Sequence, residues 1–195
     1  MDKRTALSMV ADRIAACEKC EELADHRKAT GGLTVAGDGN PDSRVMFLGE
    51  APGEDEAKQG RPFVGRSGRL LNGLLSACGW PREDVFVTNV VCCRPPRNRE
   101  PESAEAANCR KFLELRIRLV DPEWIVCLGR VASAYLLGLD PDTSVSRLRG
   151  RVRDFGNRKV VCTWHPAYVL RQEGEAQLEA KRQMLEDLSP IISSL

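Results

Sequence analysis

Short apolar runs alternate with longer stretches of helical periodicity, and this alternation constrains the fold more than any other feature of the chain. Four runs fit buried strands, at 45–48, 85–91, 124–128 and 159–163. Helical patterns cover 5–28, 67–78, 102–120, 131–137 and 174–188. Strands that alternate with helices predict a parallel sheet covered on both faces. We therefore expect an α/β protein with three layers, α/β/α, around a central, mostly parallel four-stranded sheet.

Size and composition indicate one soluble globular domain, and we expect residues 1–195 to form it, because no repeat or linker divides the chain. The net charge of +1 gives no overall basic field, although a local basic patch can lie on a neutral protein. No segment has the pattern of a signal peptide or the length of a membrane span. Eight cysteines in such a chain favour a reducing compartment and metal or cluster ligation over disulfides. We expect a cytoplasmic protein, associated with the nucleoid in a prokaryote.

The segment 49–68, GEAPGEDEAKQGRPFVGRSG, joins the first predicted strand to a helix. It contains five glycines, two prolines and four acidic residues, a composition typical of a loop with unusual backbone geometry. A loop between a strand's carboxyl end and a helix N-terminus is where open α/β sheets bind ligands. Phe63, between Pro62 and Val64, indicates a wall rather than a solvated tip. We interpret this loop as the functional site.

Two further features lie at the carboxyl ends of predicted strands, namely Asn89 and the tripeptide Trp164-His165-Pro166. Parallel strands place such residues in one crevice. An asparagine in an apolar strand needs a partner, whether a ligand or a structural group, because burying an unpaired amide is costly. A lone histidine is more often structural, which is our interpretation of His26. For His165, the strand-end position and the following proline favour a functional role.

Four motifs at these positions together resemble one known family. GEAPGEDE with GRPFVGRSG, then TNVVCCRPPRNREP, then HPAYVLR are similar, in this order, to the family 4 uracil-DNA glycosylases, the iron–sulfur branch of that superfamily. The resemblance runs from the first cysteine pair to about Arg171. It implies the uracil-DNA glycosylase fold and hydrolysis of the N-glycosidic bond of deoxyuridine, with release of uracil from a flipped nucleotide and an abasic site left behind. The motifs contain no lysine for a Schiff base, so strand cleavage is not expected.

The resemblance implies two catalytic residues. His165 would donate a hydrogen bond to uracil O2 as the departing base becomes anionic. Glu50 would orient the attacking water or stabilise the cationic sugar. The alternative for Glu50 is a structural carboxylate that caps backbone amides of its own loop. Ala51 occupies a place where other branches of the superfamily carry an aspartate.

The resemblance also implies the residues that bind the base. Phe63 would stack on the flipped uracil. Asn89 would read the base, because its amide supplies a donor and an acceptor that match O4 and N3–H. Glu56 would lie near C5, where its bulk excludes the methyl group of thymine. The remaining expected substrate-binding residues are Gly49, Ala51 and Gly53.

Four cysteines match the family's ligands for a [4Fe–4S] cluster: Cys17, Cys20, Cys93 and Cys109. The spacing alone does not exclude a four-cysteine zinc site. The choice of Cys93 over its neighbour Cys92 rests on the family's ligand, which immediately precedes Arg-Pro-Pro. We expect a structural cluster that ties the N-terminal helix to the loop after Asn89. The cysteines at 78, 127 and 162 lie in apolar surroundings and are interpreted as packing residues.

The expected partner is uracil-containing DNA, single- or double-stranded, bound by a monomer. Arg94 and Arg97, in the basic loop 94–99, are candidate phosphate contacts, and a solvated basic face is the alternative there and at 147–153. The segment 167–171 matches the one that enters the minor groove and fills the gap left by the flipped base. Its candidate residues are Tyr168, Val169 and Leu170 as the wedge, followed by Arg171.

Two other functions deserve comparison with the glycosylase. A non-turnover, covalent uracil-DNA-binding branch of the superfamily uses a histidine in an inserted Lys-Arg-Arg-Ile-His loop. The matching loop here, 94–99, contains no histidine, and the first motif has Glu-Ala where that branch has Glu-Gln. An electron carrier that uses the cluster would leave the 49–68 loop and His165 without a purpose.

Overall fold

The computed structural model describes residues 1–194, and within them the centre of the fold is a six-stranded sheet with the order β1-β3-β2-β4-β6-β5. The four inner strands are parallel and correspond to the four predicted runs: β3 (Phe86–Asn89), β2 (Val45–Gly49), β4 (Trp124–Leu128) and β6 (Arg158–Thr163). Two short antiparallel strands that the sequence did not indicate, β1 (Asp38–Gly39) and β5 (Arg153–Phe155), form the edges. They are too short and too polar to produce a strand pattern.

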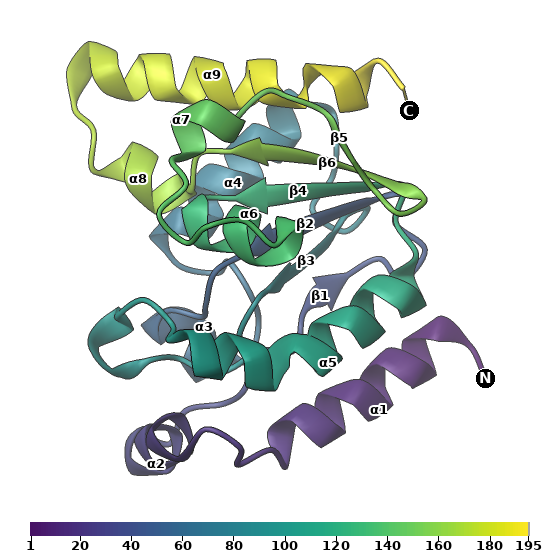
Figure 1. The fold of residues 1–195 in the computed structure, drawn as a ribbon, viewed down its shortest axis with the longest axis vertical. Coiled ribbons are helices and arrows are strands. Elements are labelled where there is room, and N and C mark those ends of the chain that lie inside the picture. The colour runs from purple at the N-terminus through teal and green to yellow at the C-terminus, as the bar shows by residue number, and fades with distance from the viewer. Residues whose placement is uncertain (195) are drawn as a thin grey trace.

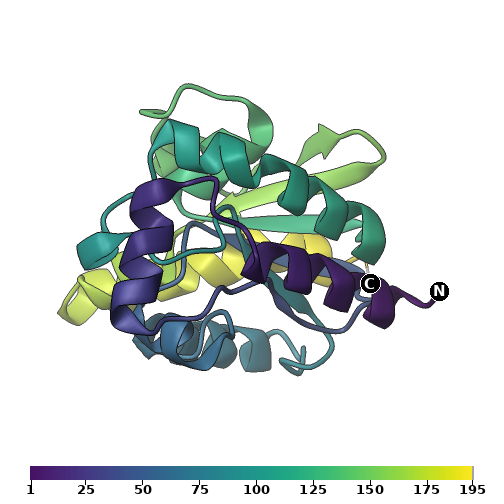
Figure 2. The same cartoon turned by 90° about the horizontal axis from the view of Figure 1, so that it is seen from below.

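Side chains of the inner strands alternate between two apolar clusters, one on each face of the sheet. From β2, Met46 and Leu48 enter one cluster, whereas Val45 and Phe47 enter the other. The first face is covered by α1 (Lys3–Ala15), α5 (Ser103–Val120) and α6 (Arg130–Leu137). The second is covered by α4 (Arg66–Ala77), α8 (Pro166–Leu170) and α9 (Gly174–Ile192). The predicted three layers are confirmed (Figures 1 and 2).

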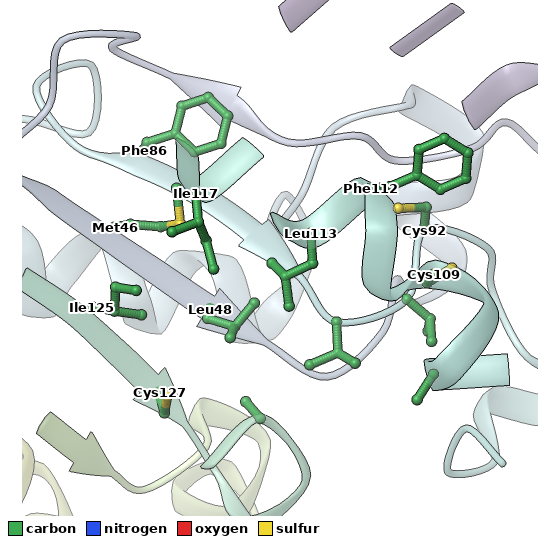
Figure 3. Close-up of a cluster of buried hydrophobic side chains, with 14 of the residues drawn as sticks. Met46, Leu48, Phe86, Cys92, Cys109, Phe112, Leu113, Ile117, Ile125 and Cys127 are labelled. Atoms are coloured by element: carbon green, nitrogen blue, oxygen red, sulfur yellow. The ribbon is translucent and has the colours of Figure 1, made fainter. Parts of the chain in front are cut away.

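The first cluster packs α5 directly onto the sheet. Figure 3 shows Leu113 and Ile117 of α5 over Leu48 and Ile125, and it shows two cysteines, Cys92 and Cys109, together at the end of the cluster beside Phe112. The core of this face is thus continuous with the region that carries the predicted metal ligands.

The predicted N-terminal helix 5–28 is wrong, because two helices occupy this region. α1 ends at Ala15, α2 (Glu21–Thr30) begins after Cys20, and the first cysteine pair lies in the link between them. The guanidinium of Arg27 on α2 donates to the carbonyls of Ala15 (2.7 Å) and Cys17 (3.1 Å) and holds the link against α2. No proline or glycine marks the break, so the helical pattern continues through it.

The segment 49–68 is not entirely loop, because it contains the short helix α3 (Glu54–Gln59). Three acidic residues fill its first turn, where negative charge suits the helix dipole. Gly60 ends it with φ of +69°, a conformation that favours glycine.

The other predicted helices are present with ends shifted by a few residues. The largest change is at α9, which extends to Ile192. The basic run 147–153 is divided between α7 (Val145–Leu148) and the start of β5, and the loop 94–99 contains the 3₁₀ turn η1 (Pro96–Asn98). No helix within residues 1–194 is both long and apolar enough to cross a membrane.

Candidate active site

The carboxyl ends of the four parallel strands open into one cavity of about 770 Å³. Its lining includes Glu50 after β2, Asn89 at the end of β3, and His165 after β6, together with Phe63 from the 49–68 segment. The structure therefore brings the three predicted strand-end features together. It also adds Gly129 and Arg130, which directly follow β4 and which the sequence reasoning missed. Applying the strand-end rule to the third strand would have found them.

Gly49 allows the Phe63 ring and the Asn89 side chain to come close together at the cavity. A Cβ at this position would lie 2.4 Å from Oδ1 of Asn89 and 2.7 Å from Cζ of Phe63, closer than real Cβ contacts. Phe63 itself has φ of +55°, and its carbonyl lies against α4, where a Cβ on Gly68 would be 1.8 Å from that oxygen. Both glycines are required by close approach, and they fix the Phe63 ring beside Asn89.

The side chain of Asn89 is buried, with 1% exposure, and its Oδ1 lacks a hydrogen-bond donor among the described residues. An unsatisfied buried acceptor costs about 1–3 kcal/mol. Because the residue lines the cavity, a ligand N–H at this point would satisfy it.

The imidazole of His165 forms the opposite side of the cavity, with its ring centroid 5.9 Å from that of Phe63. Its Nδ1 accepts the backbone N–H of Ala167 at 3.1 Å, so in the neutral ring the proton belongs on Nε2. Burial, assisted by the charge of Arg171, lowers the pKa of His165 to about 4. At neutral pH, His165 is therefore an uncharged N–H donor.

The pKa of the Glu50 carboxyl group is shifted in the opposite direction, upwards. Burial, followed by the nearby charge of Glu100, raises the pKa of Glu50 to about 7, against the opposing charges of Arg130 and Arg171. In the described part of the chain, the Glu50 carboxylate makes no hydrogen bond with the amides of its loop, so the structural alternative for this residue does not apply.

That structural role belongs to Glu56. Its carboxylate accepts three backbone N–H groups, from Gly53 (3.1 Å), Val64 (2.8 Å) and Gly65 (2.8 Å), and so joins the two ends of the 49–68 segment around α3. Gly53 must be small, because a Cβ there would lie 2.7 Å from the Glu56 Oε2. Glu56 also lines the cavity, and its expected position near C5 of a base stays a prediction.

Comparison with known proteins identifies the family. The model of the uracil DNA glycosylase superfamily matches residues 36–189. The type-4 uracil-DNA glycosylase of Thermotoga maritima is 42% identical over 93% of this chain and 91% of its own length. Those of Archaeoglobus fulgidus and Sulfurisphaera tokodaii are 40% and 37% identical, each over 85% of this chain, and over 83% and 76% of their own lengths. The chain belongs to the type-4 uracil-DNA glycosylases.

The rim of the cavity in this type-4 uracil-DNA glycosylase includes a stacked aromatic pair, Trp164 and Tyr168, with ring centroids 4.5 Å apart. The indole N–H of Trp164 donates to Gln183 of α9 at 2.8 Å, and the Arg149 guanidinium lies 5.9 Å from the indole ring centroid. Trp164 is thus held on two sides, and it fixes the Tyr168 ring.

Of the three residues predicted as the possible wedge, Val169 does not have the exposed position that this role needs. It is fully buried between α4 and α9, because the fourth position of the short helix α8 faces the core of the second face. Tyr168 and Leu170 remain partly exposed, and Tyr168 and Arg171 line the cavity.

The two predicted phosphate-binding arginines differ in their surroundings. Arg94 donates to Asn98 (2.7 Å) and Glu54 (3.3 Å), and its side chain is only 16% exposed, so it braces the loop instead of facing solvent. Arg97 is exposed, with φ of +55°. The cavity is lined instead by Arg99, which pairs with Glu105 at 2.7 Å.

The predicted cysteine ligands line a separate small pocket between α1, α2, α5 and the segment after β3. The thiols that line it are those of Cys17, Cys20, Cys92, Cys93 and Cys109. Among residues 1–194, no group of three or more His, Cys, Asp or Glu side chains already has the arrangement of a metal site. The residue types, their burial and their common pocket fit a thiolate-bound metal group, which would join the α1–α2 link to α5 and to the segment after Asn89.

Replacing Glu56 with glutamine tests its role in holding the loop. The amide has one acceptor oxygen, and its NH₂ would face a backbone N–H, so at least one of the three bonds is lost. Hydrogen bonds to charged acceptors are worth about 1.5–3 kcal/mol, and we therefore expect the amides of Gly53, Val64 and Gly65 to exchange about 10- to 100-fold faster in Glu56→Gln. NMR-detected exchange measures this, with Glu54→Gln on the same helix as the matched control. Unchanged protection would show that Glu56 is not the organising group.

Proposed function

We propose that this protein is a monofunctional uracil-DNA glycosylase that hydrolyses the N-glycosidic bond of deoxyuridine in DNA, releasing uracil and leaving an abasic site. The observation that carries the proposal is the unpaired Oδ1 of Asn89 in the same cavity as Phe63 and the neutral His165. Membership of the family and the names of its relatives support it. The proposal includes action as a monomeric single domain in the cytoplasm, on single- or double-stranded DNA.

Base recognition follows from Asn89. Its unpaired Oδ1 accepts N3–H of uracil, and its NH₂ donates to O4. Phe63 stacks on the base, and the absent side chain at Gly49 lets both groups approach it. Glu56, fixed by three backbone amides, lies where its bulk excludes a methyl group at C5.

Departure of uracil is assisted by His165. As the bond between C1′ and the base lengthens, negative charge develops on the uracil oxygens. The Nε2–H of His165 donates to O2 and stabilises this charge. Because its pKa is about 4, the imidazole is neutral before the reaction, and it acts as a fixed hydrogen-bond donor instead of an acid.

Glu50 acts on the sugar part of the nucleotide. Its carboxylate orients the attacking water or stabilises the cationic sugar, and both roles require the ionised form. Around the cavity, Arg97 and Arg171 contact phosphates, and Tyr168 or Leu170 fills the gap in the duplex.

A [4Fe–4S] cluster held by Cys17, Cys20, Cys93 and Cys109 is the proposed cofactor, with a structural role. When bound, the cluster supplies covalent links between the N-terminal segment and the core. The pocket shares no lining residue with the cavity, and no step of the hydrolysis uses it.

The function is tested with an end-labelled oligonucleotide that contains one uracil. We expect strand scission only after alkali treatment, because the product is an abasic site. Asn89→Asp puts an acceptor against uracil O4, and a mismatched buried polar group can cost as much as about 10⁴-fold in rate. Asn157→Asp, on the exposed turn before β6, is the matched control. A shifted band that survives denaturation would indicate covalent binding without turnover, and near-parent excision by Asn89→Asp would show that another group reads the base.

The pH dependence tests Glu50. Because the pKa of Glu50 is about 7 and that of His165 about 4, Glu50 is the one of these two residues that changes charge in the neutral range. The single-turnover excision rate should rise with pH and level off about one unit above pH 7. Glu50→Gln should abolish this inflection and lower the rate by about 10²–10⁴. A parent profile that is flat across neutral pH would contradict the assignment.

The cofactor is tested by isolating the protein without chelators. A [4Fe–4S] protein is brown with broad visible absorption, and Cys17→Ser should lose iron and stability before it changes the rate of the chemical step. Cys78→Ser, outside the pocket, is the control and should retain iron. A colourless, fully active protein with stoichiometric zinc would show that the site binds zinc instead of an iron–sulfur cluster.

A further inference from the structure

Asp187 of α9 is a buried carboxylate, with 2% of its surface exposed. Arg149 binds it with two nitrogens, Nε at 3.1 Å from Oδ2 and Nη2 at 2.9 Å from Oδ1. The hydroxyl of Thr163, at the end of β6, donates to the same Oδ2 at 2.6 Å. Because a buried charge needs a partner, the bidentate pair with Arg149 is what allows Asp187 to lie against the end of β6.

The backbone at Gly150 leaves space for this ion pair. Gly150 has φ of +67°, and a Cβ there would lie 2.9 Å from Oδ1 of Asp187. Its N–H donates to the carbonyl of Cys162 in β6 at 3.2 Å. Because α9 also lies along β6 (Figure 1), the turn after α7, the end of β6 and α9 meet at one place. Arg149 therefore faces α9, and its side chain is only 20% exposed although it belongs to the basic run 147–153.

The ion pair is connected to the cavity through Trp164. This residue directly follows Thr163, and it lines the cavity together with His165. The Arg149 guanidinium lies over the indole ring, 5.9 Å from its centroid, within the range of a cation–π contact. Arg149 also donates to the backbone carbonyl of Gln183 at 3.0 Å, and the side chain of Gln183 accepts the indole N–H at 2.8 Å. Arg149 and α9 together fix the plane of the indole.

Tyr168 is the side chain that this arrangement orients. Its ring stacks on Trp164 with centroids 4.5 Å apart and planes 22° apart, and it is partly exposed at the cavity. Leu170 is also partly exposed, but the lining that residues 1–194 form does not include it. That lining does not include Arg149 or Asp187 either, so they act on the cavity through Trp164. A ring whose orientation is already fixed loses less entropy when it binds.

We propose that Arg149, held by Asp187, is the positioning residue of the Tyr168 ring, and that Tyr168 is the side chain that fills the gap left in duplex DNA by the flipped nucleotide. The inference rests on the proposed function. Arg149 acts by fixing Trp164, on which Tyr168 stacks. A single strand has no paired base stack in which a gap must be filled, so the ion pair promotes excision from duplex DNA selectively.

Arg149→Lys tests the positioning role, because it keeps the positive charge but loses the planar fork that reaches Asp187, Gln183 and the indole together. Single-turnover excision is measured on one uracil oligonucleotide, as a single strand and as a duplex. We expect the duplex rate to fall about fivefold or more, while the single-strand rate stays within about twofold of the parent. Arg182→Gln, which removes an exposed arginine ion pair with Glu186 on α9, is the matched control and should change neither rate.

Tyr168→Ala and the double variant with Arg149→Lys test whether the effect passes through Tyr168. Tyr168→Ala should show the same selective loss on duplex DNA, and the double variant should be no more than about twofold slower than Tyr168→Ala alone. Losses that multiply in the double variant overturn the route through Tyr168. Equal losses on single-stranded and duplex DNA in Arg149→Lys overturn the proposal, because they indicate a general disturbance of the neighbouring His165.

If Arg149→Lys does not fold, Gln183→Ala takes its place, because it removes the acceptor of the indole N–H and leaves the ion pair intact. We then expect a duplex rate lowered about threefold or more, and a parent-like duplex rate overturns the proposal.

If the parent protein excises no uracil, the proposed function fails on its own. The inference is then decided with a duplex that carries 2-aminopurine beside the uracil, whose fluorescence rises when its neighbour leaves the stack. A rise with the parent that is smaller with Arg149→Lys supports the positioning role, and the absence of any rise with the parent overturns it.

Discussion

The site depends on one close approach, the contact of the Phe63 ring and the Asn89 amide across Gly49. Parallel pairing puts Gly49 beside Asn89 in the register of β2 and β3, and the missing side chain leaves space for the aromatic ring above them. Phe63 reaches this point because Gly68 lets α4 pack on its carbonyl. The sheet register and the two glycines thus place the flat, apolar ring of Phe63 beside the unpaired amide oxygen of Asn89 before any ligand is present.

Burial shifts the pKa values of both proposed catalytic side chains, but in opposite directions. Desolvation disfavours whichever form is charged, so the same surroundings raise the pKa of Glu50 and lower that of His165. The two groups follow different strands, β2 and β6, and Arg171 acts on both of them. The cavity therefore contains a donor that is neutral at pH values well above 4 and a carboxylate whose charge changes near pH 7.

The parallel sheet and the strand-end site could be predicted from the sequence, because a buried strand and its polar end are local patterns. The roles of residues that depend on tertiary packing could not be predicted from the sequence. Glu50 and Glu56 are both acidic residues of one glycine-rich segment, and only the folded arrangement of the backbone amides of Gly53, Val64 and Gly65 shows that Glu56 is the one that turns back onto the loop. The burial of Val169 is set by α4 and α9, which lie far away in the sequence. The break between α1 and α2 could not be predicted, because no proline or glycine marks it. It is stabilised instead by Arg27 of the following helix.

The placement of the thiol pocket has a consequence for how the chain is made. During synthesis, Cys17 and Cys20 leave the ribosome first, but the pocket is also lined by Cys93, from the segment after β3, and by Cys109 of α5. The intervening strands and helices must be synthesised before the four thiols can meet, and closing so long a loop is entropically slow. The first cysteine pair can therefore reach its partners only after the start of α5 has been made, although the pair itself is made first.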